Sequence, residues 1–374
     1  AITPVEPCSP VGSRASDSSA DLDVVGGRVP EEEWRLQDAN AAHRVSLTRP
    51  PDSDNELIKV AARHGPPGIL AVLRKHQDYS WFVVLAFRAM QTCLGPRPPS
   101  GPLHNLLRGC DPVAFAVQML ELEMIDEIFQ LMRYYSHVRD VQHHGLAIME
   151  ILIMDDPEWR DEVARKGGVS VVCDIAKERK DNQGLMCQVM TVMAYLAAED
   201  YIEVMLCQHD ALHYVSHVHK HYAKNVELAT RASLALLNLT VCELHVEELM
   251  EKQAIPLVLM VMDLHSDDIH LIIILMGVLA NYSVKADVRQ FLVKEQVLPR
   301  IADAMRIDQR NAVLQTACLK ALVNYSTSVE HYMIMDDLGI PNLVGQVMVD
   351  HAEDQGIQKY GNYFLGHHTS CPIL

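Results

Sequence analysis

Three asparagines occupy matching positions in three similar phrases of the sequence. Asn238 stands in LALLNLTV, Asn281 in GVLANYSV and Asn324 in KALVNYST, and successive asparagines are 43 residues apart. A side-chain amide carries donors and an acceptor, so it can pair with both the N–H and the C=O of an extended partner chain. It can equally bond the backbone of a neighbouring repeat. Both roles stay open for these residues and for Asn362 in YGNYFLG, which follows at a spacing of 38 residues.

A histidine-rich segment, HYVSHVHKHY, is the second place where residue types could do chemistry. His213 and His217 lie one helical turn apart, a spacing that suits a metal ion. No acidic or thiol side chain shares their register, and helix geometry points His219 elsewhere. We therefore predict a solvated, pH-sensitive helix face and no metal site.

Motifs of catalysis are missing from the sequence. G-x-x-x-x-G-K-[ST], G-x-S-x-G and H-E-x-x-H do not occur. The acidic pairs Asp155–Asp156, Asp267–Asp268 and Asp336–Asp337 fall at predicted turns or helix ends, where capping explains them. The sequence thus predicts a protein that is not an enzyme and needs no cofactor.

The nine cysteines are scattered singly and form no C-x-x-C pair, so neither a disulfide framework nor a zinc site is predicted. This usage favours a reducing, cytoplasmic compartment. Cys371 begins the final four residues, CPIL, which have the outline of a prenylation box. The proline after Cys371 and the lack of an upstream polybasic stretch argue against that modification.

Prolines mark the same period as the asparagines. Pro256, Pro299 and Pro341 are spaced by 43 and 42 residues. Proline is tolerated in the first turn of a helix, where its missing N–H has no intrahelical partner. Each proline therefore predicts a helix start. A repeat in the low forties indicates a helical solenoid, whose units bury their apolar faces only by stacking on one another.

The chain divides into five predicted segments. An acidic arm, rich in Ser, Pro and Gly and carrying 10 acidic and 5 basic side chains, is expected to be flexible. About seven three-helix repeats follow, and paired-helix repeats are the competing interpretation. The segments are residues 1–54 (arm), 55–94 (an atypical first repeat), 95–103 (a Pro/Gly loop), 104–368 (the main array) and 369–374 (the tail).

Charge limits the classes of partner. The formal net charge is −17, with 49 acidic and 32 basic residues. Such a chain repels nucleic-acid phosphates and anionic lipid surfaces unless it has a basic patch, and no long run of Lys and Arg is present. The composition therefore favours basic or extended protein segments as partners.

The phrases GIPNLVGQVM and ALVNYST resemble the armadillo repeat. The resemblance implies an all-α, right-handed superhelical solenoid in which the third helix of each repeat lines a concave groove. It also implies that Asn238, Asn281 and Asn324 hold the backbone of a bound peptide. Further toward the N-terminus the asparagine position is occupied by Tyr195 and by Leu152.

Nuclear-import receptors share this pattern but carry a tryptophan one turn before the asparagine. Leu234, Gly277 and Lys320 occupy those positions, which disfavours nuclear import. We therefore predict a non-catalytic scaffold or adaptor that is part of a larger complex. One alternative is a fixed subunit of a cytoskeletal or ciliary assembly, and another is a membrane-tethered regulator of small GTPases if Cys371 is prenylated.

Overall fold

The computed structural model describes residues 53–96, 105, 107, 109–240 and 254–369. Within these ranges every regular element is a helix, and there are 19, which confirms the prediction of an all-α chain. Residues 1–52 of the predicted arm, 97–103 of the Pro/Gly loop and Cys371 with its tail lie outside them. No helix in the described part of the chain is long and apolar enough to cross a membrane.

The chain forms two compact units, Ala1–Leu122 and Glu123–Leu374. In the first unit α2 packs on α3, and both contact α5. A kink divides α2 at Gly65, which has a φ of 64° and precedes Pro66 and Pro67. The helices of this unit are α2 (Ser53–His76), α3 (Ser80–Leu94) and α5 (Pro112–Glu121).

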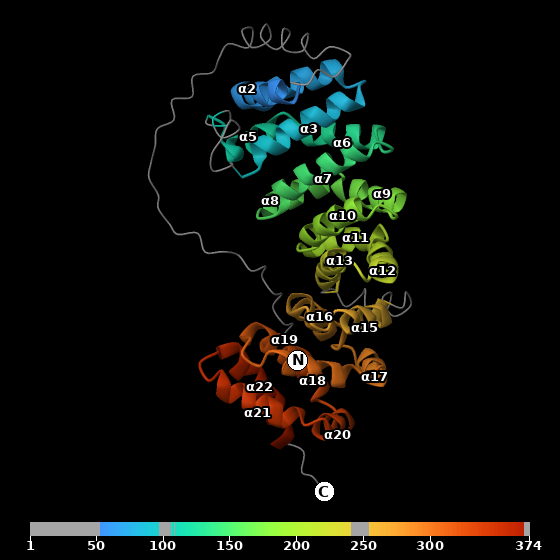
Figure 1. Cartoon of the computed structure of the whole chain (residues 1–374), viewed down its shortest axis with the longest axis vertical. Coiled ribbons are helices and arrows are strands. Elements are labelled where there is room, and N and C mark those ends of the chain that lie inside the picture. The colour runs from blue at the N-terminus through green and yellow to red at the C-terminus, as the bar shows by residue number, and fades with distance from the viewer. Residues whose placement is uncertain (1–52, 97–104, 106, 108, 241–253, 370–374) are drawn as a thin grey trace. The chain divides into compact units, whose positions relative to one another are not determined.

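The second unit is built from repeated helices of three kinds, coloured from green to red in Figure 1. The short first helices are α8 (Pro157–Arg165), α11 (Asp200–Gln208), α17 (Ala286–Lys294) and α20 (Val329–Asp337). The second helices are α6 (Met124–Tyr134), α9 (Gly168–Arg179), α12 (Ala211–Tyr222), α15 (Ala254–Leu264), α18 (Val297–Ile307) and α21 (Ile340–Asp350). The third helices are α7 (Arg139–Ile153), α10 (Gln183–Leu196), α13 (Val226–Leu239), α16 (Ile269–Tyr282), α19 (Ala312–Tyr325) and α22 (Gln355–Thr369).

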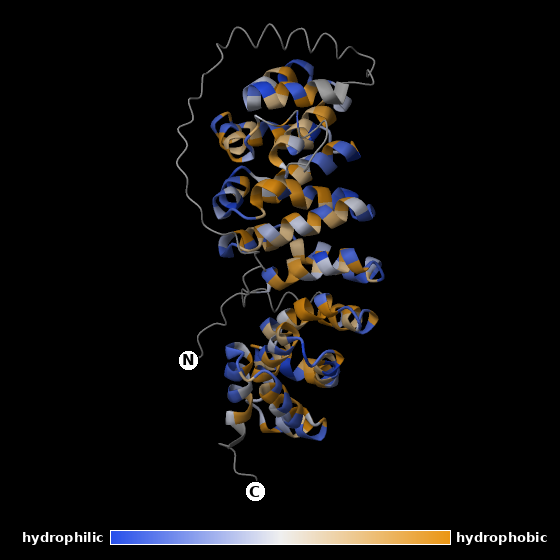
Figure 2. Cartoon of the chain, turned by 60° about the vertical axis from the view of Figure 1, so that its left-hand side comes forward, coloured by the Kyte–Doolittle hydropathy of each residue, from blue (hydrophilic) through white to orange (hydrophobic). Residues whose placement is uncertain are grey.

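Four repeats are complete in the described residues: α8–α10, α11–α13, α17–α19 and α20–α22. Three helices per repeat agree with the three-helix prediction and not with paired helices. Each third helix packs on the third helix of the next repeat, from α7 to α22. The seams hold fully buried methionine and leucine side chains such as Met190, Met276 and Leu319. Figure 2 shows hydrophobic residues (orange) running along the helices and many hydrophilic residues (blue) at their ends.

Every third helix from α10 onward begins with the same kind of cap. A side-chain oxygen of the capping residue accepts the backbone N–H three residues further on, which satisfies one of the donors that a helix N-terminus leaves unpaired. The caps recur at intervals of 43 residues: Asn182, Asn225, Asp268, Asn311 and Asp354. This row fixes the register of the third helices.

The step from the first to the second helix also repeats. Four residues at this step have a left-handed backbone: Gly167, Asp210, Gln296 and Gly339. Glu123, directly before the second helix α6, has one too. The chain then enters a second helix, and Pro256, Pro299 and Pro341 lie in the first turns of α15, α18 and α21. This confirms the prediction that each proline marks a helix start.

Side chains of one repeat bond the carbonyls at the turn of the preceding repeat. Four such bonds join residues 42 or 43 apart: Arg179 to Ser136, Tyr222 to Lys180, His265 to Ala223 and His351 to Gln309. Within repeats, the amides of Gln142, Gln315 and Gln358 each donate to two carbonyls at the end of the second helix. Helix ends are therefore satisfied by neighbouring elements as well as by solvent.

The left-handed step predicts opposite effects for two substitutions. A non-glycine residue there is strained by roughly 1 kcal/mol, so Gln296→Gly should raise the free energy of unfolding by about that amount. Gly339→Ala should lower it by about 1 kcal/mol, because a Cβ at Gly339 meets no atom within 4 Å and only the backbone conformation (φ of 71°) opposes it. Equal unfolding midpoints in urea for both variants and the parent would contradict this.

Candidate partner-binding face

The stacked third helices present one continuous surface, which we call the third-helix face. It consists of the solvent-facing positions of α7, α10, α13, α16, α19 and α22. Asn238, Asn281 and Asn324 lie on this face near the ends of α13, α16 and α19, and all three are half-buried. The structure thus places the three asparagines in equivalent positions on successive helices.

Each asparagine bonds the third helix of the preceding repeat. The Nδ2 group of Asn238 donates to the carbonyl oxygen of Ala194 at 2.7 Å. Asn281 donates to the Leu237 carbonyl at 3.3 Å, and Asn324 to the Ala280 carbonyl at 3.0 Å. These acceptors lie in the last turn of a helix, where carbonyls lack an intrahelical partner. The asparagines therefore tie successive repeats together, which is the intramolecular role left open by the sequence.

Two hydroxyl groups of the preceding repeats also accept hydrogen bonds from the asparagines. Thr240 comes two residues after Asn238, and Ser283 comes two residues after Asn281. Asn281 Nδ2 also donates to Thr240 Oγ1 at 3.2 Å, and Asn324 Nδ2 to Ser283 Oγ at 2.9 Å. Both amide hydrogens of Asn281 and Asn324 are therefore used. The Oδ1 atoms of the three asparagines have no hydrogen-bond donor among the described residues. Each Oδ1 is left as an acceptor, held in place by the bonds of its own amide nitrogen.

The row changes character toward the N-terminus. Tyr195 lies thirteen residues after its cap Asn182, as the asparagines do after theirs, so the structure agrees with its assignment to this position. Leu152 was misassigned. The cap of α7 is Val138, 44 residues before Asn182, so Ile151 holds the equivalent position, while Leu152 is buried.

Asn362 does not continue the row. It lies eight residues after its cap Asp354, not thirteen, and its side chain is exposed. The equivalent residues of earlier third helices are fully buried: Met190, Ser233, Met276 and Leu319. A polar residue at this position suits a terminal repeat, whose outer face meets water.

Between and beside the asparagines the face is mostly uncharged. Leu234, Gly277 and Lys320 hold the positions where import receptors carry tryptophan, and all three are half-buried. The Nζ atom of Lys320 lies 5.5 Å from the ring centroid of Tyr360. The described solvent-facing positions of α16, α19 and α22 include no acidic residue. Among the described third helices, acidic residues are therefore confined to α7 and α13.

The histidine-rich segment forms most of α12, with His219 buried and His213 and His221 exposed. His217 and His221 face each other with ring centroids 4.4 Å apart, and burial lowers the pKa of His217. His219 is buried instead, 3.1 Å from Ser233 Oγ, and burial lowers its pKa to about 4. No group of three or more metal-ligating side chains occurs within the described ranges.

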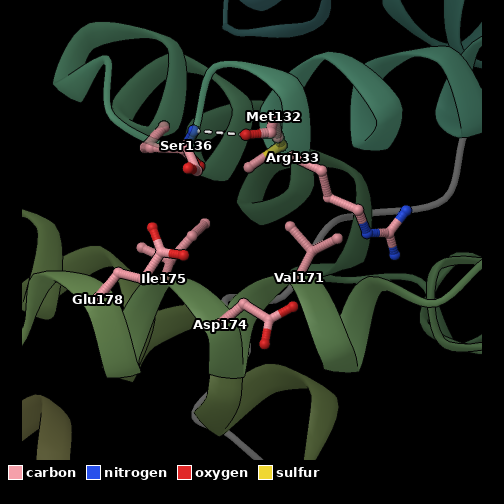
Figure 3. A pocket seen from close by; sticks show the side chains of 8 residues that line it. Met132, Arg133, Ser136, Val171, Asp174, Ile175 and Glu178 are labelled. Atoms are coloured by element: carbon pink, nitrogen blue, oxygen red, sulfur yellow. Dashed lines mark hydrogen bonds between the residues drawn. The ribbon is translucent and has the colours of Figure 1, made fainter.

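A hollow of about 190 Å³ lies away from the third-helix face, between α6 and α9. Figure 3 shows Asp174 and Glu178 on α9 below Met132 on α6 and Ser136 in the turn that follows it, with the guanidinium of Arg133 turned aside. Arg133 donates to the Gly167 carbonyl at 3.4 Å. The lining mixes apolar and exposed polar groups, so we describe the hollow as a gap between second helices and assign it no function.

Known structures share this architecture at low sequence identity. No protein-family model matches the sequence, and no curated protein does. An engineered protein is 12% identical over 91% of this chain and 92% of its own, with a TM-score of 0.63. A designed armadillo repeat protein in complex with the peptide (KR)4 is 13% identical over 65% of this chain and 98% of its own, with a TM-score of 0.55.

A third similar chain comes from a structural study of a phosphorylation switch that controls the interaction between cadherin and β-catenin. It is 12% identical over 89% of this chain and 60% of its own, with a TM-score of 0.63. These likenesses show the fold, which is an all-α solenoid of the armadillo type, as the resemblance of its sequence phrases predicted.

The asparagine bonds predict a loss of stability on truncation. Asn324→Ala removes one of the two donors to the Ala280 carbonyl, which keeps its bond from Ser283 Oγ, and removes the donor to Ser283 Oγ. It should lower the free energy of unfolding by about 1 kcal/mol. Asn362→Ala is the matched control, because its exposed side chain makes no such bond, and it should change stability by less than about 0.5 kcal/mol. Chemical denaturation of both variants measures this. Similar losses would mean that Asn324 does not join the repeats.

Proposed function

We propose that this chain is a non-catalytic scaffold or adaptor that binds a segment of a protein partner along its third-helix face. Armadillo folds commonly serve as peptide- or protein-binding scaffolds, and the designed armadillo protein described above holds the peptide (KR)4. The observation that carries the proposal is the row of asparagine Oδ1 atoms, which are held in place by their own amide nitrogens and have no donor in the described residues.

An extended segment is the ligand that suits this row. Its backbone presents N–H groups at regular intervals of roughly 3.3 Å per residue. Packed helices are about 8–10 Å apart, so successive asparagines would meet every second or third residue of such a segment. Asn238, Asn281 and Asn324 would each accept one backbone N–H. They therefore have two roles, joining the repeats through Nδ2 and holding the partner through Oδ1.

The surroundings of the row constrain the side chains of the partner. Ile273 on α16, Val284 directly after α16 and Val313 in the first turn of α19 offer apolar surface along these two repeats. Acidic residues of the face gather on the earlier helices, where Asp140, Glu150 and Glu227 lie. We infer a partner segment with apolar residues over α16 and α19 and a basic portion over α7 to α13. This replaces the expectation that acidity attracts basic residues along the whole face.

We propose that the protein is located in the cytoplasm, where cysteine thiols stay reduced. The six cysteines in the described ranges form no disulfide with one another, and burial raises the pKa of the Cys173 thiol to about 12. Prenylation of Cys371 remains a proposal, and intact-mass measurement of the cellular protein tests it.

A permanent subunit of a cytoskeletal or ciliary assembly would use the same face but keep its partner through high-salt washing, whereas an adaptor would release it.

Photo-crosslinking tests the location of the binding surface. Val313 lies on the third-helix face and is 60% exposed, and Met333 lies on the first helix α20 and is 64% exposed. p-Benzoylphenylalanine at Val313 should give discrete protein adducts in cells, and the same group at Met333 should give few.

A pair of exposed valines supplies the control. Val284→Lys, in the turn directly after α16, should diminish the adducts formed at Val313, whereas Val329→Lys, on α20, should not. Adducts at Met333 in place of Val313, or equal effects of the two lysine variants, would contradict the proposed surface.

A further inference from the structure

Glu150 on α7 is a half-buried acid that the fold leaves without a partner. It lies on the third-helix face twelve residues after the cap Val138, near the start of the row that continues with Tyr195 and Asn238. Its carboxylate makes no hydrogen bond and no ion pair within the described residues, although the helix it stands on is otherwise well packed. Burial raises the pKa of Glu150, so its charged form is held at a cost.

Tyr195 lies beside this carboxylate on the adjoining helix α10. Tyr195 is thirteen residues after its cap and Glu150 is twelve residues after its own. In the next pair of helices the same two positions are in contact, since Asn238 Nδ2 donates to the Ala194 carbonyl at 2.7 Å. Burial raises the pKa of the Tyr195 hydroxyl, and the charges of Glu150 and Asp155 raise it further. The hydroxyl of Tyr195 makes no hydrogen bond in the described part of the chain. A half-buried carboxylate, a phenol ring and a second acid thus face the same stretch of surface.

The two arginines near this spot are engaged elsewhere. The Nη1 atom of Arg231 donates to Thr191 Oγ1, and its Nη2 atom donates to Glu227 Oε1 at 2.9 Å. Arg160 donates to the Ile153 and Met154 carbonyls and to Glu199. The charge of Arg231 opposes the rise in the pKa of Glu150, but its N–H groups are committed to other acceptors. None of the described residues donates a hydrogen bond to the Glu150 carboxylate.

We propose that Glu150 and Tyr195 form a subsite for an arginine side chain of the bound partner segment. This inference rests on the proposed function, because it names a side chain of the segment that lies along the same face. A guanidinium can donate two parallel hydrogen bonds to one carboxylate while its plane stacks on a phenol ring. Asp155 adds negative charge at the open edge of the subsite. Lysine would supply one point charge and no planar fork, so it fits less well.

The subsite is tested with defined peptides. Fluorescein-labelled octapeptides of alternating arginine and serine, lysine and serine, or citrulline and serine are titrated with the full chain at about 50 mM salt, and anisotropy is recorded. Citrulline keeps the shape of arginine but has no charge. The arginine peptide should bind several-fold more tightly than the lysine peptide, and the citrulline peptide should bind least.

Variants of the chain then locate the binding. Glu150→Gln should weaken binding of the arginine peptide by about tenfold, the lower end for a lost charge-assisted hydrogen bond. Glu178→Gln removes one exposed acid from the second helix α9 and should change it by less than about twofold. Tyr195→Phe keeps the ring and should be much milder than Tyr195→Ala. Glu150→Gln should leave the melting temperature unchanged or higher, because it removes an unpaired half-buried charge, so lost binding cannot be ascribed to unfolding.

Several outcomes would overturn the subsite. Equal losses for Glu150→Gln and Glu178→Gln would mean that general acidity attracts the peptide. Equal binding of the arginine and citrulline peptides, or no binding of the arginine peptide, would remove the role of Glu150. None of these results touches the crosslinks at Val313, which do not depend on Glu150. Persistent crosslinks would therefore leave the binding face standing while this subsite fails.

Discussion

The carbonyl groups at the ends of the third helices need donors, and at α10, α13 and α16 an asparagine of the next repeat supplies one. An α-helix leaves its last four carbonyls without intrahelical partners. Asn238, Asn281 and Asn324 each donate to such a carbonyl of the preceding third helix. The same requirement is met at the second helices by Gln142, Gln315 and Gln358. Stacking of the repeats and completion of the helix ends are thus one event, which is why the spacing is kept so regularly.

This requirement also shapes the surface available to a partner. An amide whose nitrogen is fixed to the previous repeat has little rotational freedom left to lose, so its oxygen can accept a hydrogen bond at a small entropic cost. The face is therefore pre-organised where the asparagines lie. On the same face, the half-buried carboxylate of Glu150 accepts no hydrogen bond from any described residue. Contacts that stabilise the fold and contacts left open for a partner lie in one row.

The sequence predicted the parts of this arrangement that follow a strict period. The asparagines, Tyr195 and the three prolines were placed correctly because single residue types recur at 42 or 43 residues. The caps Asn182, Asn225, Asp268, Asn311 and Asp354 keep the same period, and could have been found had Asn and Asp been treated as equivalent. The number of residues between the cap and the asparagine is eight for Asn362 and thirteen for the row, so it separates Asn362 from the row. Comparison of short sequence phrases did not reveal this difference.

Other features were beyond a reading of the sequence. The 44-residue step between Val138 and Asn182 shifts the row at α7 by one residue, and nothing in the phrases around Leu152 marks that shift. The confinement of acidic residues to one part of the face depends on which helix surface each side chain occupies, so the net charge of −17 gave no hint of it. Glu150 stands out only because the nearby Arg231 bonds Thr191 and Glu227 instead of it. Recognising this requires the positions of these side chains in space, which the sequence does not give.

The most direct test of the account is the free-energy coupling between Asn324 and Ser283, which belong to successive repeats and bond at 2.9 Å. A double-mutant cycle of Asn324→Ala and Ser283→Ala, measured by equilibrium unfolding in urea, isolates that interaction. We predict a coupling energy of about 1 kcal/mol in favour of the native pair. Additive effects of the two substitutions, with no coupling, would contradict the claim that the asparagine row holds the repeats together.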